Sequence, residues 1–199
     1  MHDEIIARYS EMLDEFDSET LTLTVTIPDA GTLTAENALE RMGFNLTLTH
    51  RPAPGDIPDP GDLVFVQLPT GVITIDGLSP NDARKEITDR LAGPGYRHWY
   101  LSWELGETAR LYCRYGDAEG DLLHPEPVDV PFTDWTDHLG PVGPYADLFR
   151  ATYNTEEHEA QLDIEAVCLT VLELETGIAF TEDLLSSASL RLPAAVLSD

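Results

Sequence analysis

Lysine, cysteine and long apolar runs are scarce in this sequence. Lys85 is its only lysine, and Cys113 and Cys168 are its only cysteines. Two cysteines in separate apolar segments are too few for the disulfide framework of a small secreted domain, and a metal site would require further ligands beside them. We therefore expect two buried, reduced thiols. The absence of an apolar run of roughly 18 residues, together with the acidic start of the chain, predicts a soluble cytoplasmic protein.

The scarcity of lysine is part of a large excess of acid. The sequence has 37 acidic and 11 basic residues and a formal net charge of -26. A protein binds phosphates by replacing their counterions with its own cations, so this composition disfavours direct contact with nucleic acid or an anionic membrane. It favours a basic protein partner. A solvated acidic surface, or adaptation to a salty cytoplasm, would explain the same charge without any partner.

The acid is concentrated in the C-terminal part of the chain. Residues 115–190 contain 17 acids and a single base, Arg150. Four of the basic residues lie together in 84–97, so we expect an electrically polarised molecule. The acids predicted to form a partner-binding surface are Asp117, Glu119, Asp121, Glu126, Asp129, Asp134, Asp137, Glu156, Glu157 and Glu159.

Apolar periodicity predicts the elements of the N-terminal part. Apolar residues at helical spacing indicate a helix over 3–16, and alternating threonine and aliphatic residues indicate a half-buried strand over 21–27. A second helix over 34–42 is expected to end at Gly43. Two apolar runs within 63–75, separated by a Pro-Thr-Gly turn, predict a β-hairpin.

The remaining elements follow the same patterns. A helix is expected to start at Ser79, and two central antiparallel strands over 96–105 and 109–115 precede a short strand at 122–123. Prolines predict an irregular connection up to about Tyr145.

Three further segments complete the prediction. A long helix is expected from its cap at Asn154 to Gly177, and Thr181 is expected to cap a short one. A last apolar segment covers 190–197. Because helices frame a group of strands and do not alternate strictly with them, we predict a single α+β domain over 1–199, with an antiparallel, meander-like sheet framed by helices.

Motifs of common catalytic and metal sites are incomplete. Lys85 follows Arg84 within a predicted helix, so it does not end a phosphate-binding loop. Asp117, Glu119 and Asp121 resemble the first ligands of a calcium loop, but Leu122 stands where that loop requires glycine. The sequence therefore predicts no catalytic residue, no cofactor and no bound metal.

Two local arrangements keep a chemical role open. At helical spacing, Asp134 and His138 would face one another beside Trp135, although such residues in a proline-rich connection more often bind the backbone. His98 and Cys113 lie in adjacent predicted strands, but no orienting group or oxyanion site accompanies them.

Three stretches resemble an uncharacterised family of actinobacterial proteins of similar length. They are 34–43 (TAENALERMG), 112–120 (YCRYGDAEG) and 172–185 (LELETGIAFTEDLL). The family has a helix that ends in Arg-x-Gly, an aromatic segment before an acidic glycine turn, and a long helix followed by Thr-Gly and a short helix. The resemblance implies a bacterial origin and no established activity. Some such families resemble the immunity proteins of toxin systems.

The charge leads to one functional expectation and two alternatives. We expect a non-enzymatic cytoplasmic interaction protein, an inhibitor or immunity-type factor, whose acidic C-terminal surface binds a basic protein such as a nuclease. The first alternative is a small enzyme or ligand-binding domain with a pocket near Trp99, Trp103 or Trp135, lined by His98 or His138. The second is an acidic domain whose charge serves only solubility or salt adaptation.

Overall fold

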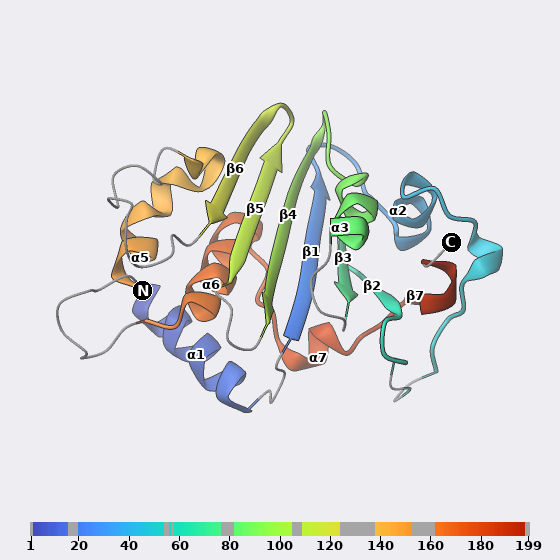
Figure 1. Ribbon diagram of the computed structural model, residues 1–199, viewed down its shortest axis with the longest axis horizontal. Helices are drawn as coiled ribbons and strands as arrows, with labels where there is room; N and C mark the ends of the chain where they lie inside the picture. The colour runs from blue at the N-terminus through green and yellow to red at the C-terminus, as the bar shows by residue number, and fades with distance from the viewer. Residues whose placement is uncertain are drawn as a thin grey trace.

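One antiparallel sheet runs through the molecule (Figure 1). The computed structural model describes residues 2–15, 20–53, 56, 58–76, 82–104, 109–123, 138–152 and 162–197. Every pair of neighbouring strands in the sheet is antiparallel, and helices lie against it. The predicted antiparallel α+β fold is confirmed.

The sheet order separates strands that are close in sequence. The strands are β1 (Thr20–Pro28), β2 (Leu63–Gln67), β3 (Val72–Asp76), β4 (Tyr96–Glu104), β5 (Arg110–Tyr115), β6 (Ala118–Leu123) and β7 (Leu190–Leu192). They are arranged in the order β6-β5-β4-β1-β3-β2-β7. The predicted hairpin over 63–75 and the predicted pairing of 96–105 with 109–115 are both confirmed. The first strand lies between these two groups and joins them.

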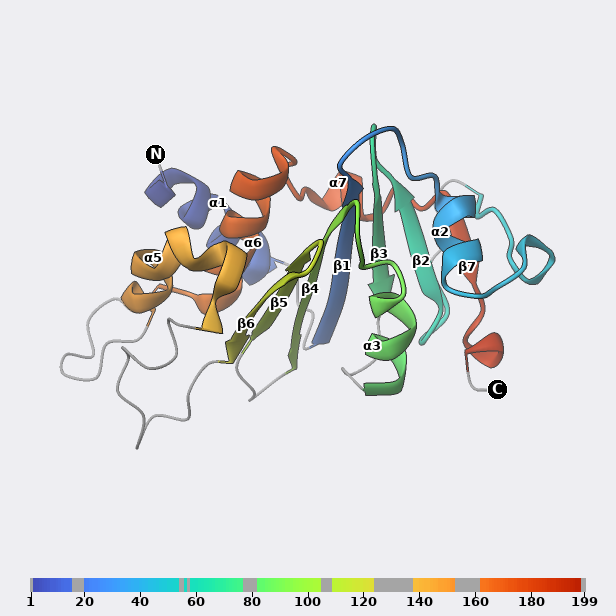
Figure 2. The ribbon, with the colours of Figure 1, turned by 90° about the horizontal axis from the view of Figure 1, so that it is seen from above.

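Helices cover the two faces of the sheet unequally (Figure 2). They are α1 (His2–Glu15), α2 (Ala35–Arg41), α3 (Asp82–Asp89), α5 (Ala146–Ala151), α6 (Ile164–Thr176) and α7 (Glu182–Leu185), with the 3-10 segments η1 (Leu46–Leu48), η3 (Gly140–Tyr145) and η4 (Ala194–Val196). The larger core lies between α1, α6 and one face of β1, β4 and β5. A smaller core lies between α2 and the opposite face of β2, β3 and β7.

The expectation of a half-buried first strand is wrong. Thr22, Thr24 and Thr26 are only 6%, 1% and 0% exposed, although they point away from the larger core. They are buried because β1 is central and a polar network covers their face. Within that network the hydroxyl of Thr24 lies 2.6 Å from that of Thr74 on β3. The alternation of threonine with aliphatic residues therefore distinguishes a polar and an apolar face of β1, and both faces are buried.

Most helix boundaries follow from capping residues. The side chain of Thr34 accepts the amide of Asn37 at the start of α2, and Thr181 does the same for Leu184 at the start of α7. Gly43 and Gly177 adopt the positive φ angles of 95° and 69° that stop α2 and α6, as expected.

The start of the long helix differs from the prediction. It begins after Asp163, whose carboxylate accepts the amides of Glu165 and Ala166. The predicted cap at Asn154 lies outside the described residues, as does the predicted start of α3 at Ser79. An aspartate nearer the apolar stretch thus provides the cap that the helix uses.

Candidate functional site

Only part of the predicted acidic surface falls within the described residues. Asp117, Glu119 and Asp121 lie on the β5–β6 hairpin, and the first two are exposed. The other seven predicted residues lie outside the described ranges: Glu126, Asp129, Asp134, Asp137, Glu156, Glu157 and Glu159.

Basic side chains lie among these three acids. Glu119 Oε1 is 3.5 Å from Nε of Arg114 on the neighbouring strand. Burial raises the pKa of Asp121, whereas the positive charges of Lys85 and Arg110 act in the opposite direction. This end of the sheet is therefore a mixture of opposite charges, and Lys85 from the predicted basic region contributes to it.

Other acids after position 114 lie on the opposite face of the sheet and are used internally. Glu173 on α6 accepts hydrogen bonds from Arg8 and Tyr9 of α1, and Glu175 accepts them from Tyr115 and Tyr145. Burial raises the pKa of Glu165 to about 8. The described acids of this region therefore occupy both faces, and not all of them are charged at neutral pH.

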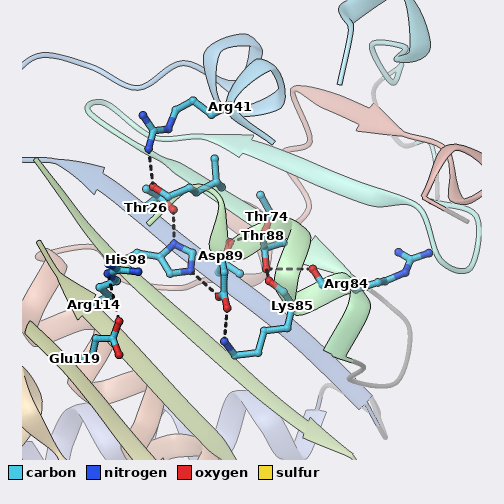
Figure 3. A network of polar contacts seen from close by, with 12 residues as sticks. Thr26, Arg41, Thr74, Arg84, Lys85, Thr88, Asp89, His98, Arg114 and Glu119 are labelled. Atoms are coloured by element: carbon cyan, nitrogen blue, oxygen red, sulfur yellow. Dashed lines mark hydrogen bonds and ion pairs between the residues drawn. The ribbon is translucent and has the colours of Figure 1, made fainter. Parts of the chain in front are cut away.

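A polar network that is buried at Thr26 and His98 and half-buried at Lys85 and Asp89 links α3 to β1 and β4 (Figure 3). Thr26 Oγ1 lies 2.8 Å from His98 Nδ1, and His98 Nε2 lies 3.8 Å from Asp89 Oδ1. Lys85 Nζ donates to the other oxygen of Asp89 at 2.5 Å and also sits 4.2 Å above the ring of Tyr112. The network fixes α3 on the polar face of the sheet.

Burial and neighbouring polar groups together set the protonation states of the network. Burial lowers the pKa of His98, so the imidazole is neutral at pH 7 and its 3.8 Å approach to Asp89 is not an ion pair. Burial opposes ionisation of Asp89, but His98 and Lys85 together hold the pKa of this carboxyl below its usual value. The charge of Asp89 is therefore balanced by Lys85.

Thr26, His98 and Asp89 follow one another in the order of nucleophile, base and acid in a catalytic triad, but the first two are not accessible to a substrate. Thr26 and His98 are both 0% exposed, so a substrate cannot reach either side chain. Cys113 is also out of reach of His98, because it lies opposite Trp99 and consecutive strand residues point to opposite faces. The possibility of a His98–Cys113 pair is thus wrong. Burial raises the pKa of Cys113 to about 12, which keeps the thiol protonated.

We predict that His98→Asn weakens the acid sensitivity of folding. The pKa of His98 is depressed in the fold from its ordinary value of 6.5, so its contribution to stability is present above pH 6.5 and is lost as the pH falls below it. The wild-type free energy of unfolding is expected to fall by up to about 1.4 kcal/mol per pH unit from this group. Urea unfolding between about pH 7 and pH 5 measures the slope.

The matched control is His138→Asn, because His138 is exposed. This variant is expected to keep the wild-type slope, whatever its absolute stability. Equal slopes in wild type and His98→Asn would contradict the role assigned to the buried imidazole.

A cavity of about 770 Å³ lies on the other face of the sheet, beside α7. Its floor is a row of side chains from neighbouring strands: Arg191 is opposite Val64, and Val64 is opposite Ile75. Leu21 of β1 extends this floor. Most of the lining is apolar, and its walls come from α7, from the residues that follow α7 and from the described residues near Pro52: Glu182, Leu185, Ser186, Ser187, Ala188, Pro52, Ala53, Asp56 and Pro58.

Arg191 joins one wall to the floor. It is only 4% exposed, and its Nη2 donates to the backbone carbonyl of Asp56. Its backbone also exchanges hydrogen bonds of 2.9 and 3.1 Å with His50. Asp56 and Glu182 line the cavity and are exposed, so its rim is acidic.

Sequence reasoning placed the pocket elsewhere. Trp99 and Trp103 are 0% and 7% exposed within the larger core, and neither they nor His98 line this cavity. Trp135 lies outside the described residues. In the sequence, only the charged Arg191 between two leucines pointed to an unusual environment at this strand. The residues that lie beside it on the floor of the cavity are far away in sequence, so the cavity could not be predicted from it.

Other chemical features are sparse in the described part of the chain. No group of three histidine, cysteine or acidic residues is arranged there to hold a metal ion. Among the same residues, no helix combines the length and the apolar character that a bilayer crossing requires. Comparisons with protein-family models, curated proteins and solved structures found no match to this chain.

Proposed function

We propose that this protein is a non-enzymatic cytoplasmic interaction protein, of inhibitor or immunity type, that binds a basic protein. A nuclease or another nucleic-acid-binding protein is the favoured kind of partner, because its binding surface is already suited to a polyanion. One observation carries the proposal. Even if each of the 11 basic residues neutralised one acid, 26 of the 37 acids would remain uncompensated.

Physical reasoning links this excess to binding. Uncompensated carboxylates repel one another and oppose compaction, whereas a cationic partner relieves the repulsion and is drawn in at long range. Exposed acids such as Asp117, Glu182 and Asp183 are available for that contact. The inaccessibility of Thr26 and His98 favours binding over catalysis by the one triad-like chain described.

Salt dependence tests the proposal. Proteins captured by the purified chain from its native cells are identified, and their affinities are measured between about 0.05 and 0.5 M salt. We expect a basic partner whose affinity falls by about tenfold or more over this range, mainly through slower association. A neutral or acidic partner, or an affinity that does not depend on salt, would contradict the proposal and leave the acid as a solubility device.

A charge-matched pair of variants tests the predicted position of the surface. Asp117→Asn/Glu119→Gln and Asp82→Asn/Glu86→Gln remove the same charge from exposed sites on the β5–β6 hairpin and on α3. The first pair is expected to slow association with the captured partner about threefold to tenfold, and the second less than twofold. Equal effects of the two pairs on the association rate would show that binding depends on the net charge and not on the position of the acids.

A further inference from the structure

We propose that the cavity beside α7 receives an apolar side chain from a basic segment of the partner. This inference rests on the proposed function and adds a defined anchor to it. The proposed occupant is a short peptide segment in which one or two large apolar residues are flanked by lysine or arginine.

The shape and lining of the cavity support an apolar anchor. Its volume of about 770 Å³ is within the range of pockets that enclose drug-sized groups, which also accommodates one or two large side chains. Val64, Ile75 and Leu185 present aliphatic surface from the sheet and from α7. Burying one leucine or phenylalanine against such surface contributes roughly 1.5–3 kcal/mol.

The charges around the cavity favour a basic segment. Asp56 and Glu182 line it and are exposed, and the adjacent Asp59 and Asp183 are exposed as well. Arg191 is the one basic side chain in the described lining, and it is buried where it binds the carbonyl of Asp56. An apolar anion would meet this acidic rim and the net charge of -26, whereas lysines beside an apolar anchor would complement both.

This combination corresponds to a usual source of specificity in interfaces. Long-range charge speeds encounter but selects poorly, whereas an apolar anchor that fills a pocket within a polar rim provides most of the binding energy. The cavity would therefore distinguish the true partner from other basic proteins.

Defined peptides test the inference. The probes are a fluorescent lysine-rich peptide with two adjacent leucines, the same peptide with serines in place of the leucines, and a leucine peptide with glutamates in place of the lysines. Binding is measured by fluorescence anisotropy at low salt. We expect the lysine–leucine peptide to bind at least about tenfold more tightly than the serine peptide, as burial of one leucine implies. We also expect it to bind more tightly than the glutamate peptide, which the acidic rim and the net charge of -26 repel.

Pocket-filling variants locate the binding site. Ser187 lines the cavity and is exposed, and its hydroxyl only donates to the carbonyl of Leu184, so Ser187→Trp fills the cavity without disturbing the core. In this variant the lysine–leucine peptide is expected to bind no more tightly than the serine peptide. Ala83→Trp on α3 adds the same side chain to an exposed site on the opposite face and is expected to keep that advantage. Ser186→Phe provides a second filling variant if Ser187→Trp does not fold by circular dichroism.

The outcomes separate the two proposals. If the lysine–leucine peptide keeps its advantage in a folded filling variant, the cavity is not the site, although binding of basic partners stands. If the glutamate–leucine peptide binds as tightly as the lysine one, the cavity takes apolar ligands without regard to charge and the basic occupant is wrong. If neither lysine-rich peptide binds at low salt, the proposed function itself fails.

Discussion

Replacing Gly120 by alanine is expected to destabilise the protein by about 3 kcal/mol. A Cβ atom at this position of β6 would lie 2.0 Å from the carbonyl oxygen of Leu139 and 3.0 Å from Sγ of Cys113. Leu139 cannot retreat easily, because it is itself completely buried. The contact is reciprocal, since a Cβ on Gly140 would lie 2.0 Å from the backbone oxygen of Glu119.

Urea unfolding followed by far-UV circular dichroism measures the loss. Gly143→Ala is the matched control, because a Cβ at Gly143 would meet nothing within 4 Å. We expect the control to change stability by less than about 0.5 kcal/mol. A Gly120→Ala protein as stable as the control would show that β6 and the segment at Leu139 do not pack as closely as described. The position of Glu119 and Asp121 depends on the same packing, since both lie on β6.

Trp99→Ala is expected to cost about 3–5 kcal/mol. Trp99 is completely buried on β4, its indole nitrogen donates to the hydroxyl of Tyr115 at 3.0 Å, and the two rings meet edge to face at a centroid distance of 5.3 Å. Tyr115 in turn donates to Glu175 of α6. The substitution thus leaves a large void and removes the hydrogen bond that holds the Tyr115 hydroxyl from the side of β4.

Trp99→Phe separates the two contributions. It keeps much of the ring volume but loses the hydrogen bond, so we expect a loss of about 1–2 kcal/mol. Thermal and urea unfolding of both variants measure the difference. If the two substitutions cost the same, the hydrogen bond to Tyr115 and not the packing of the ring would account for the stability.

The candidate site was the least predictable part of the molecule. The acidic composition was plain, but the placement of Glu119 beside Arg114 depends on the register of β5 and β6, and the burial of Glu173 depends on how α6 packs against α1. The cavity was not predicted at all, because its floor brings together Leu21, Val64 and Arg191. These residues are separated by dozens of positions and share no local pattern.

The sequence by itself determined the local elements and the fold class. Helix caps at Thr34 and Thr181, stops at Gly43 and Gly177, and alternation along the strands depend on neighbouring residues only, so a linear reading finds them. Tertiary structure alone decided the insertion of β1 between two strand groups, the burial of its threonine face and the choice of Asp163 as the cap of α6. Those outcomes are set by contacts between segments far apart in the chain, where packing outweighs local preference.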